Sequence, residues 1–244
     1  MYQSFLLLIR ACNANNQFSK DDWFGFSENP RPEPEIAKQN SSVIRNHISA
    51  CKKITSTILD RLSEKLNLTN PPLSELHKFE RTAGNQMRII KTTSHESREQ
   101  GTMVAGAHTD FGSLTVLFNN VGGLQVLLDP QVGWLWVPPV EGCAIINLGD
   151  AMVRFTDGLF RSATHRVVQP PDEQRDWDRY SVVYFERPND DVKLRPLTRD
   201  AGDLEQYVTS KEWIERRVLG GKKNHYAGEK NYYARRGTET VEKA

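Results

Sequence analysis

The sequence predicts a mainly β protein, with a sandwich or jelly-roll core and flanking α-helices. Between Asn85 and Arg187, short runs rich in β-branched and aromatic residues alternate with turn residues. Roughly eight such runs at this spacing are typical of a sandwich or jelly roll. Before and after this region, apolar residues recur at helical spacing. We therefore expect one domain with three parts: a helical and irregular flanking region at 1–84, the jelly-roll core at 85–190, and a C-terminal helix and tail at 191–244 that pack on the core.

Each expected strand of the core lies between turn signals. Gly122-Gly123, Asp129-Pro130 and Pro170-Pro171 are three of these signals, because Gly and Pro interrupt regular strand pairing. The expected strands are Met87 to Thr92, Met103 to His108, Ser113 to Asn119, Leu124 to Leu128, Trp134 to Val137, Cys143 to Leu148, Thr164 to Gln169 and Ser181 to Glu186.

The flanking regions carry helix signals. Ser41-Ser42 offers an N-cap to a long amphipathic helix with an apolar stripe from Ile44 to Leu66. A short second helix is expected from Leu73 to Glu80. Near the C-terminus, Thr209 and Glu212 form a capping box, and the helix that follows is expected to end at Gly220-Gly221.

Composition and charge exclude several classes of partner. Lysine plus arginine (32) nearly equals aspartate plus glutamate (31), so no strong field is expected to recruit nucleic acid or a membrane surface. The apolar run from Phe5 to Ile9 is too short to span a bilayer. The three cysteines are far apart, without zinc or disulfide spacing. We expect a cytoplasmic protein; the sequence does not indicate its oligomeric state.

Two metal-ligand residues stand in the segment Ala107-His108-Thr109-Asp110. Residues two apart on a strand point to the same face, so His108 and Asp110 are expected to share a metal ion. Of the other histidines, His165 is the one in a β-rich segment downstream. Two histidines and one carboxylate leave coordination positions open, an arrangement diagnostic of non-haem iron(II) oxygenases.

A carboxylate clamp is predicted downstream of His165, in Arg179-Tyr180-Ser181. Arg179 and Ser181 alternate onto one face of a strand. A guanidinium fork with a hydroxyl beside it is suited to one carboxylate of a dicarboxylic acid.

Six stretches of the core, which include the ligand and clamp motifs, resemble in their order the iron(II)- and 2-oxoglutarate-dependent dioxygenases of the isopenicillin N synthase-like superfamily. The resemblance covers about Met87 to Pro188, and the Trp213 helix and Arg236 to Glu239 are more weakly similar to fungal members. The matching stretches are Gly106 to Thr115, Gly122 to Val126, Trp136 to Pro139, Ile146 to Asp150, Thr164 to Val168 and Arg179 to Ser181.

The resemblance implies a double-stranded β-helix with iron(II) at its mouth. It assigns His108, Asp110 and His165 as catalytic iron ligands, and Arg179 and Ser181 as ligands of the cosubstrate 2-oxoglutarate. O2 is then the oxidant, with ascorbate as a candidate reductant. The implied activity is oxidation of a small organic substrate by hydroxylation, desaturation or ring closure, with specialised-metabolite biosynthesis as a candidate role.

The chain departs from the family pattern in three ways. The gap from His165 to Arg179, which holds Pro170 to Asp178, is a few residues longer than usual and is expected to form a surface loop. The family's Tyr-Pro stretch, whose tyrosine contacts the cosubstrate, corresponds to Ile90 to Thr93 here. The N-terminal region is shorter than the family's, so we expect a chain shortened at that end. Two alternatives therefore stay open: a catalytically inactive, dioxygenase-like binding protein, and an iron oxidase that does not use 2-oxoglutarate.

Three further residues follow the clamp strand and are expected to border the substrate: Phe185, Arg187 and Asn189. Glu141 and Asp150, by contrast, are interpreted as turn-forming acidic residues and not as a catalytic pair.

Overall fold

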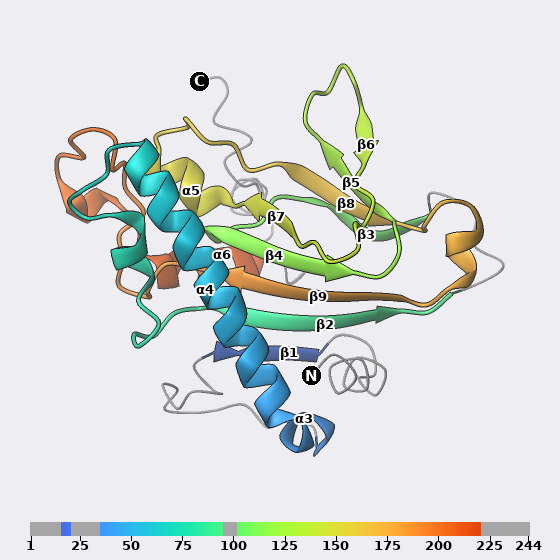
Figure 1. The fold of residues 1–244 in the computed structure, drawn as a ribbon. Helices are drawn as coiled ribbons and strands as arrows, with labels where there is room; N and C mark the ends of the chain where they lie inside the picture. The colour runs from blue at the N-terminus through green and yellow to red at the C-terminus, as the bar shows by residue number, and fades with distance from the viewer. Residues whose placement is uncertain (1–15, 21–34, 95–101, 221–244) are drawn as a thin grey trace.

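Two antiparallel β-sheets face each other in the computed structural model, which describes residues 16–20, 35–94 and 102–220 (Figure 1). The first sheet has the order β1-β2-β9-β4-β7 and the second the order β3-β8-β5-β6. The prediction of a mainly β fold with a jelly-roll core is confirmed. In both sheets, strands that pair with each other are often distant in the sequence. The strands are β1 (Asn16–Ser19), β2 (Gln86–Thr92), β3 (Met103–His108), β4 (Leu114–Asn119), β5 (Leu124–Leu127), β6 (Trp134–Trp136), β7 (Ile145–Leu148), β8 (Thr164–Val168) and β9 (Arg179–Glu186).

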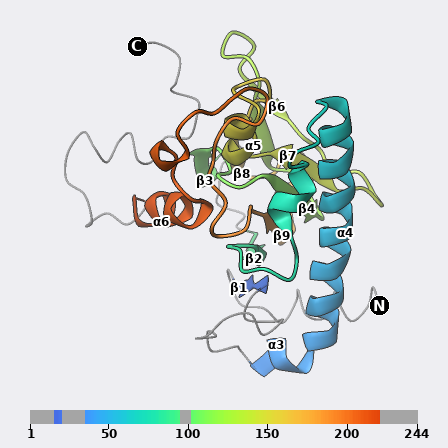
Figure 2. The same cartoon turned by 90° about the vertical axis from the view of Figure 1, so that its left-hand side faces the viewer.

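The helices flank the sheets. Figure 2 shows α4 (Ser41–Lys65) and α6 (Ser210–Gly220) on opposite sides of them. Two short helices, α3 (Glu35–Gln39) and α5 (Asp150–Phe155), complete the α-helical set of the described residues. Turns of 3-10 helix lie at η1 (Leu73–His77), η2 (Asp172–Asp176) and η3 (Leu204–Gln206). No helix among the residues described is long and apolar enough to cross a membrane.

The long helix α4 covers the outer face of the first sheet. Its buried stripe and Ala37 of α3 pack with outward-facing strand residues in one core cluster: Ala37, Ile44, Ile48, Cys51, Met87, Ile89, Val116, Val182 and Tyr184. Because side chains alternate along a strand, burying Val182 and Tyr184 under α4 turns Arg179, Ser181 and Val183 toward the opposite sheet. The packing of α4 therefore determines which face of β9 is available to a site.

A buried polar network also joins α4 to β9. The Glu186 carboxylate is fully buried and lies 2.8 Å from the Lys52 ammonium. Thr55 and Tyr184 each donate a hydrogen bond of 3.0 Å to its other oxygen. The carboxylate thus has the partners that a buried charge requires.

The predicted elements agree well with those observed. All eight expected strands, the long helix and the capped C-terminal helix are present, and Thr209 and Glu212 exchange both hydrogen bonds of the capping box. The segment expected as a helix from Leu73 to Glu80 is a 3-10 turn at Leu73–His77. The elements β1, α3 and α5 were not predicted. The apolar run from Phe5 to Ile9 and the family-like stretch from Arg236 to Glu239 lie outside the described residues.

Candidate functional site

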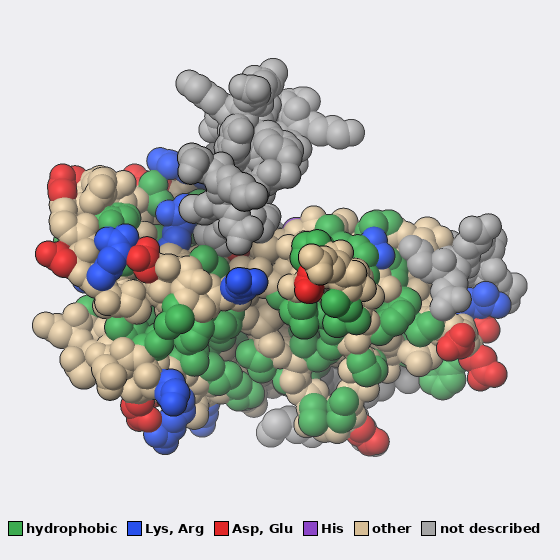
Figure 3. All heavy atoms as spheres, turned by 90° about the horizontal axis from the view of Figure 1, so that it is seen from above, with side chains coloured by type: hydrophobic (Ala, Val, Ile, Leu, Met, Phe, Trp, Pro, Cys, Tyr) green, Lys and Arg blue, Asp and Glu red, His purple; other side chains and the backbone are tan. Residues whose placement is uncertain are grey.

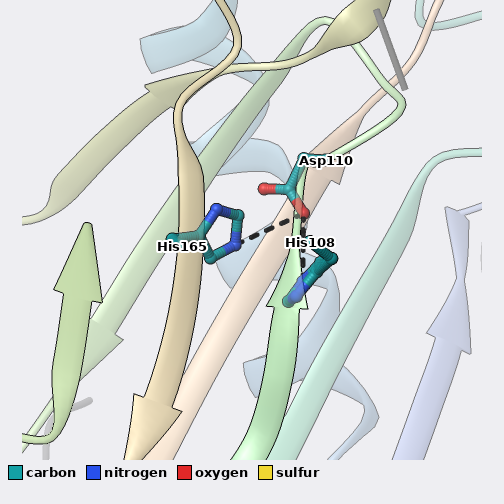
Figure 4. Close-up of side chains that lie close together, drawn as sticks. All are labelled: His108, Asp110 and His165. Carbon is teal, nitrogen blue, oxygen red and sulfur yellow. Dashed lines mark ion pairs between the residues drawn. The ribbon is translucent and has the colours of Figure 1, made fainter. Parts of the chain in front are cut away.

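Three predicted metal ligands lie together between the two sheets. His108 ends β3, Asp110 follows in the next loop, and His165 lies opposite His108 on β8 (Figure 4). One ligand atom from each of the three residues lies within 4.8 Å of the others. Asp110 Oδ1 is 3.9 Å from His108 Nε2 and 3.8 Å from His165 Nε2. The arrangement therefore presents two imidazole nitrogens and one carboxylate oxygen to a common point.

Hydrogen bonds orient each histidine toward that point. His108 Nδ1 lies 2.8 Å from the Gly106 carbonyl oxygen, and His165 Nδ1 lies 3.0 Å from that of Ala163. A carbonyl only accepts, so each Nδ1 carries the proton and donates it. In the neutral imidazole with this tautomer, Nε2 is the atom that carries the lone pair and can bind a metal ion.

Asp110 is oriented in the same way through its other oxygen. Thr115 donates to Asp110 Oδ2 at 2.6 Å, and Asn147 donates at 2.8 Å. Burial would by itself raise the pKa of Asp110, but the two histidines and these two hydrogen bonds outweigh it and the pKa is lowered. Oδ1 of an ionised carboxylate is thus free to face the imidazoles. Burial, with His165 adding to it, also lowers the pKa of His108, which favours its neutral, ligand-competent form.

The predicted clamp residues lie on the same inner face as Asp110's partner Thr115. Thr115 pairs with Phe185, and Asn119 pairs with Ser181, so β4 and β9 share this face. Arg179 is almost fully buried and donates to the Gly122 carbonyl at 2.9 Å and to the Ser181 hydroxyl. Burial lowers its pKa to about 10, which still leaves it charged near neutral pH.

The Arg179 guanidinium has no carboxylate partner among the described residues. A buried cation without a carboxylate partner is suited to bind an anionic ligand, because burying an unpaired charge is costly. The family's tyrosine position is occupied by β2, where Ile90 pairs with Ser181 and Thr92 with Arg179.

Helix α6 contacts the loop that carries Asp110. Trp213 Nε1 donates to the Phe111 carbonyl at 3.0 Å. Arg217 lies 3.3 Å from the buried Asp150 carboxylate, which also accepts a hydrogen bond of 3.1 Å from Thr109. The Asp150 backbone N–H donates to the Asp110 carbonyl at 2.7 Å. Asp150 is therefore a structural residue at the start of α5, not the turn residue that we expected.

Sequence reasoning missed the residues that orient the triad. Thr115 and Asn147 each stand at a position within an expected strand and a family-like stretch, but neither was given a role, because nothing in their local pattern distinguished them. Of the three expected substrate-border residues, Phe185 pairs with Thr115, the partner of Asp110, and the Arg187 guanidinium lies 5.7 Å from the Phe185 ring centroid. Asn189 instead donates to backbone carbonyls, with the 2.9 Å bond to Lys78 the shortest, and its position is structural.

Gly149 lies against the ligand loop with no room for a side chain. A Cβ there would stand 2.3 Å from the Gly112 carbonyl oxygen and 2.8 Å from that of Asp110. We expect Gly149→Ala to displace the loop, with a loss of roughly 1–3 kcal/mol in unfolding free energy and weaker metal binding. Thermal unfolding and anaerobic iron(II) titration measure the two effects. Gly106→Ala is the matched control, because a Cβ at Gly106 meets no atom within 4 Å; equal behaviour of the two variants would contradict the prediction.

The surface near the site is apolar on one side. Figure 3 shows hydrophobic side chains gathered over the β5–β6 hairpin. The large exposed apolar residues on and just after this hairpin are Leu128, Val132, Leu135, Trp136 and Val140. Leu135 pairs with Val126, which pairs with His165, so an apolar row continues from the hairpin to the triad on the inner face.

Comparison with known proteins agrees with this architecture. Residues 83–188 match the family model of the 2OG-Fe(II) oxygenase superfamily. The chain is 32% identical over 197 residues to the 2-oxoglutarate-dependent dioxygenase iboH of Amanita muscaria, covering 76% of this chain and 93% of that protein. It is 34% identical over 181 residues to the 2-oxoglutarate-dependent dioxygenase frbH of a Dothideomycetidae species, covering 72% of this chain. The chain spans about half the length of frbH, 53%.

Solved structures show the same fold. A full-length Neurospora crassa protein crystallised with alpha-KG superposes with a TM-score of 0.69 at 26% identity, covering 84% of this chain and 65% of that one. A rice dioxygenase for auxin oxidation superposes with a TM-score of 0.66 at 17% identity, covering 91% of this chain and 82% of that one. By sequence and by fold, the chain belongs to the 2OG-Fe(II) oxygenase superfamily.

Proposed function

We propose that this chain is a non-haem iron(II) oxygenase that uses 2-oxoglutarate and O2 to oxidise a small organic substrate. The observation that carries the proposal is the triad geometry: Asp110 Oδ1 faces two imidazole Nε2 atoms, while every other polar atom of the three side chains is hydrogen-bonded. That donor set suits iron(II) with positions left for further ligands. Structural zinc, in contrast, prefers a closed set of four ligands.

The residues present also suit the cosubstrate. Arg179 and Ser181 would bind the distal carboxylate of 2-oxoglutarate, since a buried guanidinium and a hydroxyl lie side by side there. Bound iron(II) with 2-oxoglutarate and O2 supplies the oxidising chemistry, for hydroxylation, desaturation or ring closure. The protein's own part is to hold His108, Asp110 and His165 in ligand-competent states and to keep the clamp desolvated.

Several coarser expectations belong to the same proposal. The core at 85–190 would carry the chemistry, with 1–84 and 191–244 as flanking parts; the family match at 83–188 supports this division. The balanced charge supports a small-molecule partner over nucleic acid or a membrane. A cytoplasmic location, ascorbate as a reductant and a role in specialised metabolism stay predictions.

Anaerobic titration tests the proposal directly. Iron(II) and then 2-oxoglutarate are added to purified protein while the visible spectrum is recorded. A charge-transfer band of the chelated keto acid is expected in the wild type and should be absent in His108→Ala. Folded protein without a band would favour the inactive binding protein. A normal iron site with no succinate released in air would favour an oxidase independent of 2-oxoglutarate.

A further inference from the structure

A second arginine, Arg88, lies on the inner face of the first sheet beside the site. It pairs with Val183 on β9, and Val183 pairs with Leu117 on β4. This row lies between two others. The clamp residue Ser181 stands in the row on one side, and Thr115 with Asn147, which hold Asp110, stand in the row on the other. Arg88 therefore shares the inner face with both halves of the proposed site.

The side chain of Arg88 leans toward the metal end of this face. Its Nε donates to the Gln86 carboxamide at 3.0 Å, and its guanidinium carbon lies 5.2 Å from the Phe185 ring centroid. Gln86 and Phe185 pair with each other in the same row as Thr115. The two terminal nitrogens of the guanidinium have no hydrogen-bond acceptor among the described residues. One edge of the Arg88 fork is thus held, and the other is available.

The charge balance around Arg88 favours an anion. Arg187 is buried and lies over the same Phe185 ring, so two guanidinium groups share one aromatic side chain. Burial lowers the pKa of Arg88, and Asp110 is the one acidic group that opposes this shift. Asp110 already receives two hydrogen bonds and faces the two histidines. The inner face therefore carries cationic charge that no described carboxylate is placed to neutralise.

We propose that Arg88 binds a carboxylate of the organic substrate, so that the substrate is an organic acid. The inference rests on the proposed function and names the substrate class of that site. Two terminal guanidinium nitrogens match the two oxygens of a carboxylate in a forked pair. The apolar row through Val126 and Leu135 on the opposite sheet would contact the rest of the molecule.

Paired probes test the charge requirement. A panel of aromatic and aliphatic monocarboxylic acids, each matched with its primary amide, is titrated onto anaerobic protein loaded with iron(II) and 2-oxoglutarate. Binding is read by ligand-observed NMR, which does not depend on turnover. The wild type should bind each acid more tightly than its matched amide. Arg88→Gln should weaken acid binding by roughly 30-fold, and Arg88→Lys by less, because lysine keeps the charge but loses the fork.

Arg166→Gln is the matched control. Arg166 also bonds to a glutamine carboxamide at 2.8 Å, that of Gln125, and lies 4.1 Å from the Trp134 ring centroid. It stands one residue from His165 on β8 and so points to the opposite, outer face. Acid binding should be unchanged in this variant. If Arg88→Gln does not fold, the weaker acid binding expected in Arg88→Lys tests the proposal in its place.

Several results would overturn the proposal. Equal binding of acids and amides to the wild type, no acid binding at all, or inorganic phosphate binding as tightly as the acids would each contradict a carboxylate site. So would a loss of 2-oxoglutarate affinity in Arg88→Gln, because it would assign this arginine to the cosubstrate. Arg88-dependent acid binding in a protein that shows no charge-transfer band would instead support the anion site while the proposed oxygenase function failed.

Discussion

Asp110→Asn is expected to reduce iron(II) affinity by 100-fold or more, since even the partners that orient a metal ligand contribute roughly 10–100-fold. The substitution removes the one anionic ligand of the triad. It also places an amide where Thr115 and Asn147 now donate hydrogen bonds of 2.6 and 2.8 Å to Oδ2. If the amide oxygen stays with these donors, its NH2 group faces the metal; if it turns, the NH2 group opposes the Asn147 donor.

Equilibrium dialysis with iron(II) under anaerobic conditions measures this effect. Asp157→Asn is a suitable control, because Asp157 forms an exposed ion pair with Arg199. Asn147→Ala should lie between the two, with a loss of roughly 10–100-fold. Wild-type affinity in folded Asp110→Asn protein would remove Asp110 from the ligand set.

Arg179→Ala is expected to weaken 2-oxoglutarate binding by roughly 100-fold, the scale of removing one partner from a buried, hydrogen-bonded charge pair. Iron(II) affinity should be little changed, because Arg179 contacts Gly122 and Ser181 and none of the triad. Ser181→Ala should cost about tenfold, as it removes one hydrogen bond to a charged group.

The charge-transfer band, titrated with 2-oxoglutarate, separates the two affinities. Arg199→Ala, an exposed arginine paired with Asp157, removes the same charge far from the clamp and should leave the band unchanged. Normal 2-oxoglutarate affinity in Arg179→Ala would refute the clamp assignment.

The layers of the fold were predictable from local patterns. Alternation of apolar residues and turn signals identified the eight strands of the core, and a regular apolar stripe identified α4. The missed elements are short. Helix α5 has six residues and begins inside a segment that we interpreted as a turn, because a single helical turn has too few residues to show a period.

The candidate metal ligands were also predictable, because their spacing in the sequence limits which residues can share one face of a strand. His108 and Asp110 are close in sequence, and few histidines compete for the third position, so residue type and strand alternation limited the choice. The same holds for Arg179 and Ser181, which stand on one strand.

The sequence by itself determined the strand pattern, the long helix and the residues proposed to hold metal and cosubstrate. Only the tertiary structure showed what surrounds them. Thr115 and Asn147 orient Asp110, α6 contacts the loop that carries it, and Arg88 lies between the clamp and the triad. The physical reason is strand register. Which residues face each other across β2, β9, β4 and β7 depends on pairing between segments far apart in the chain, and no local pattern encodes that pairing.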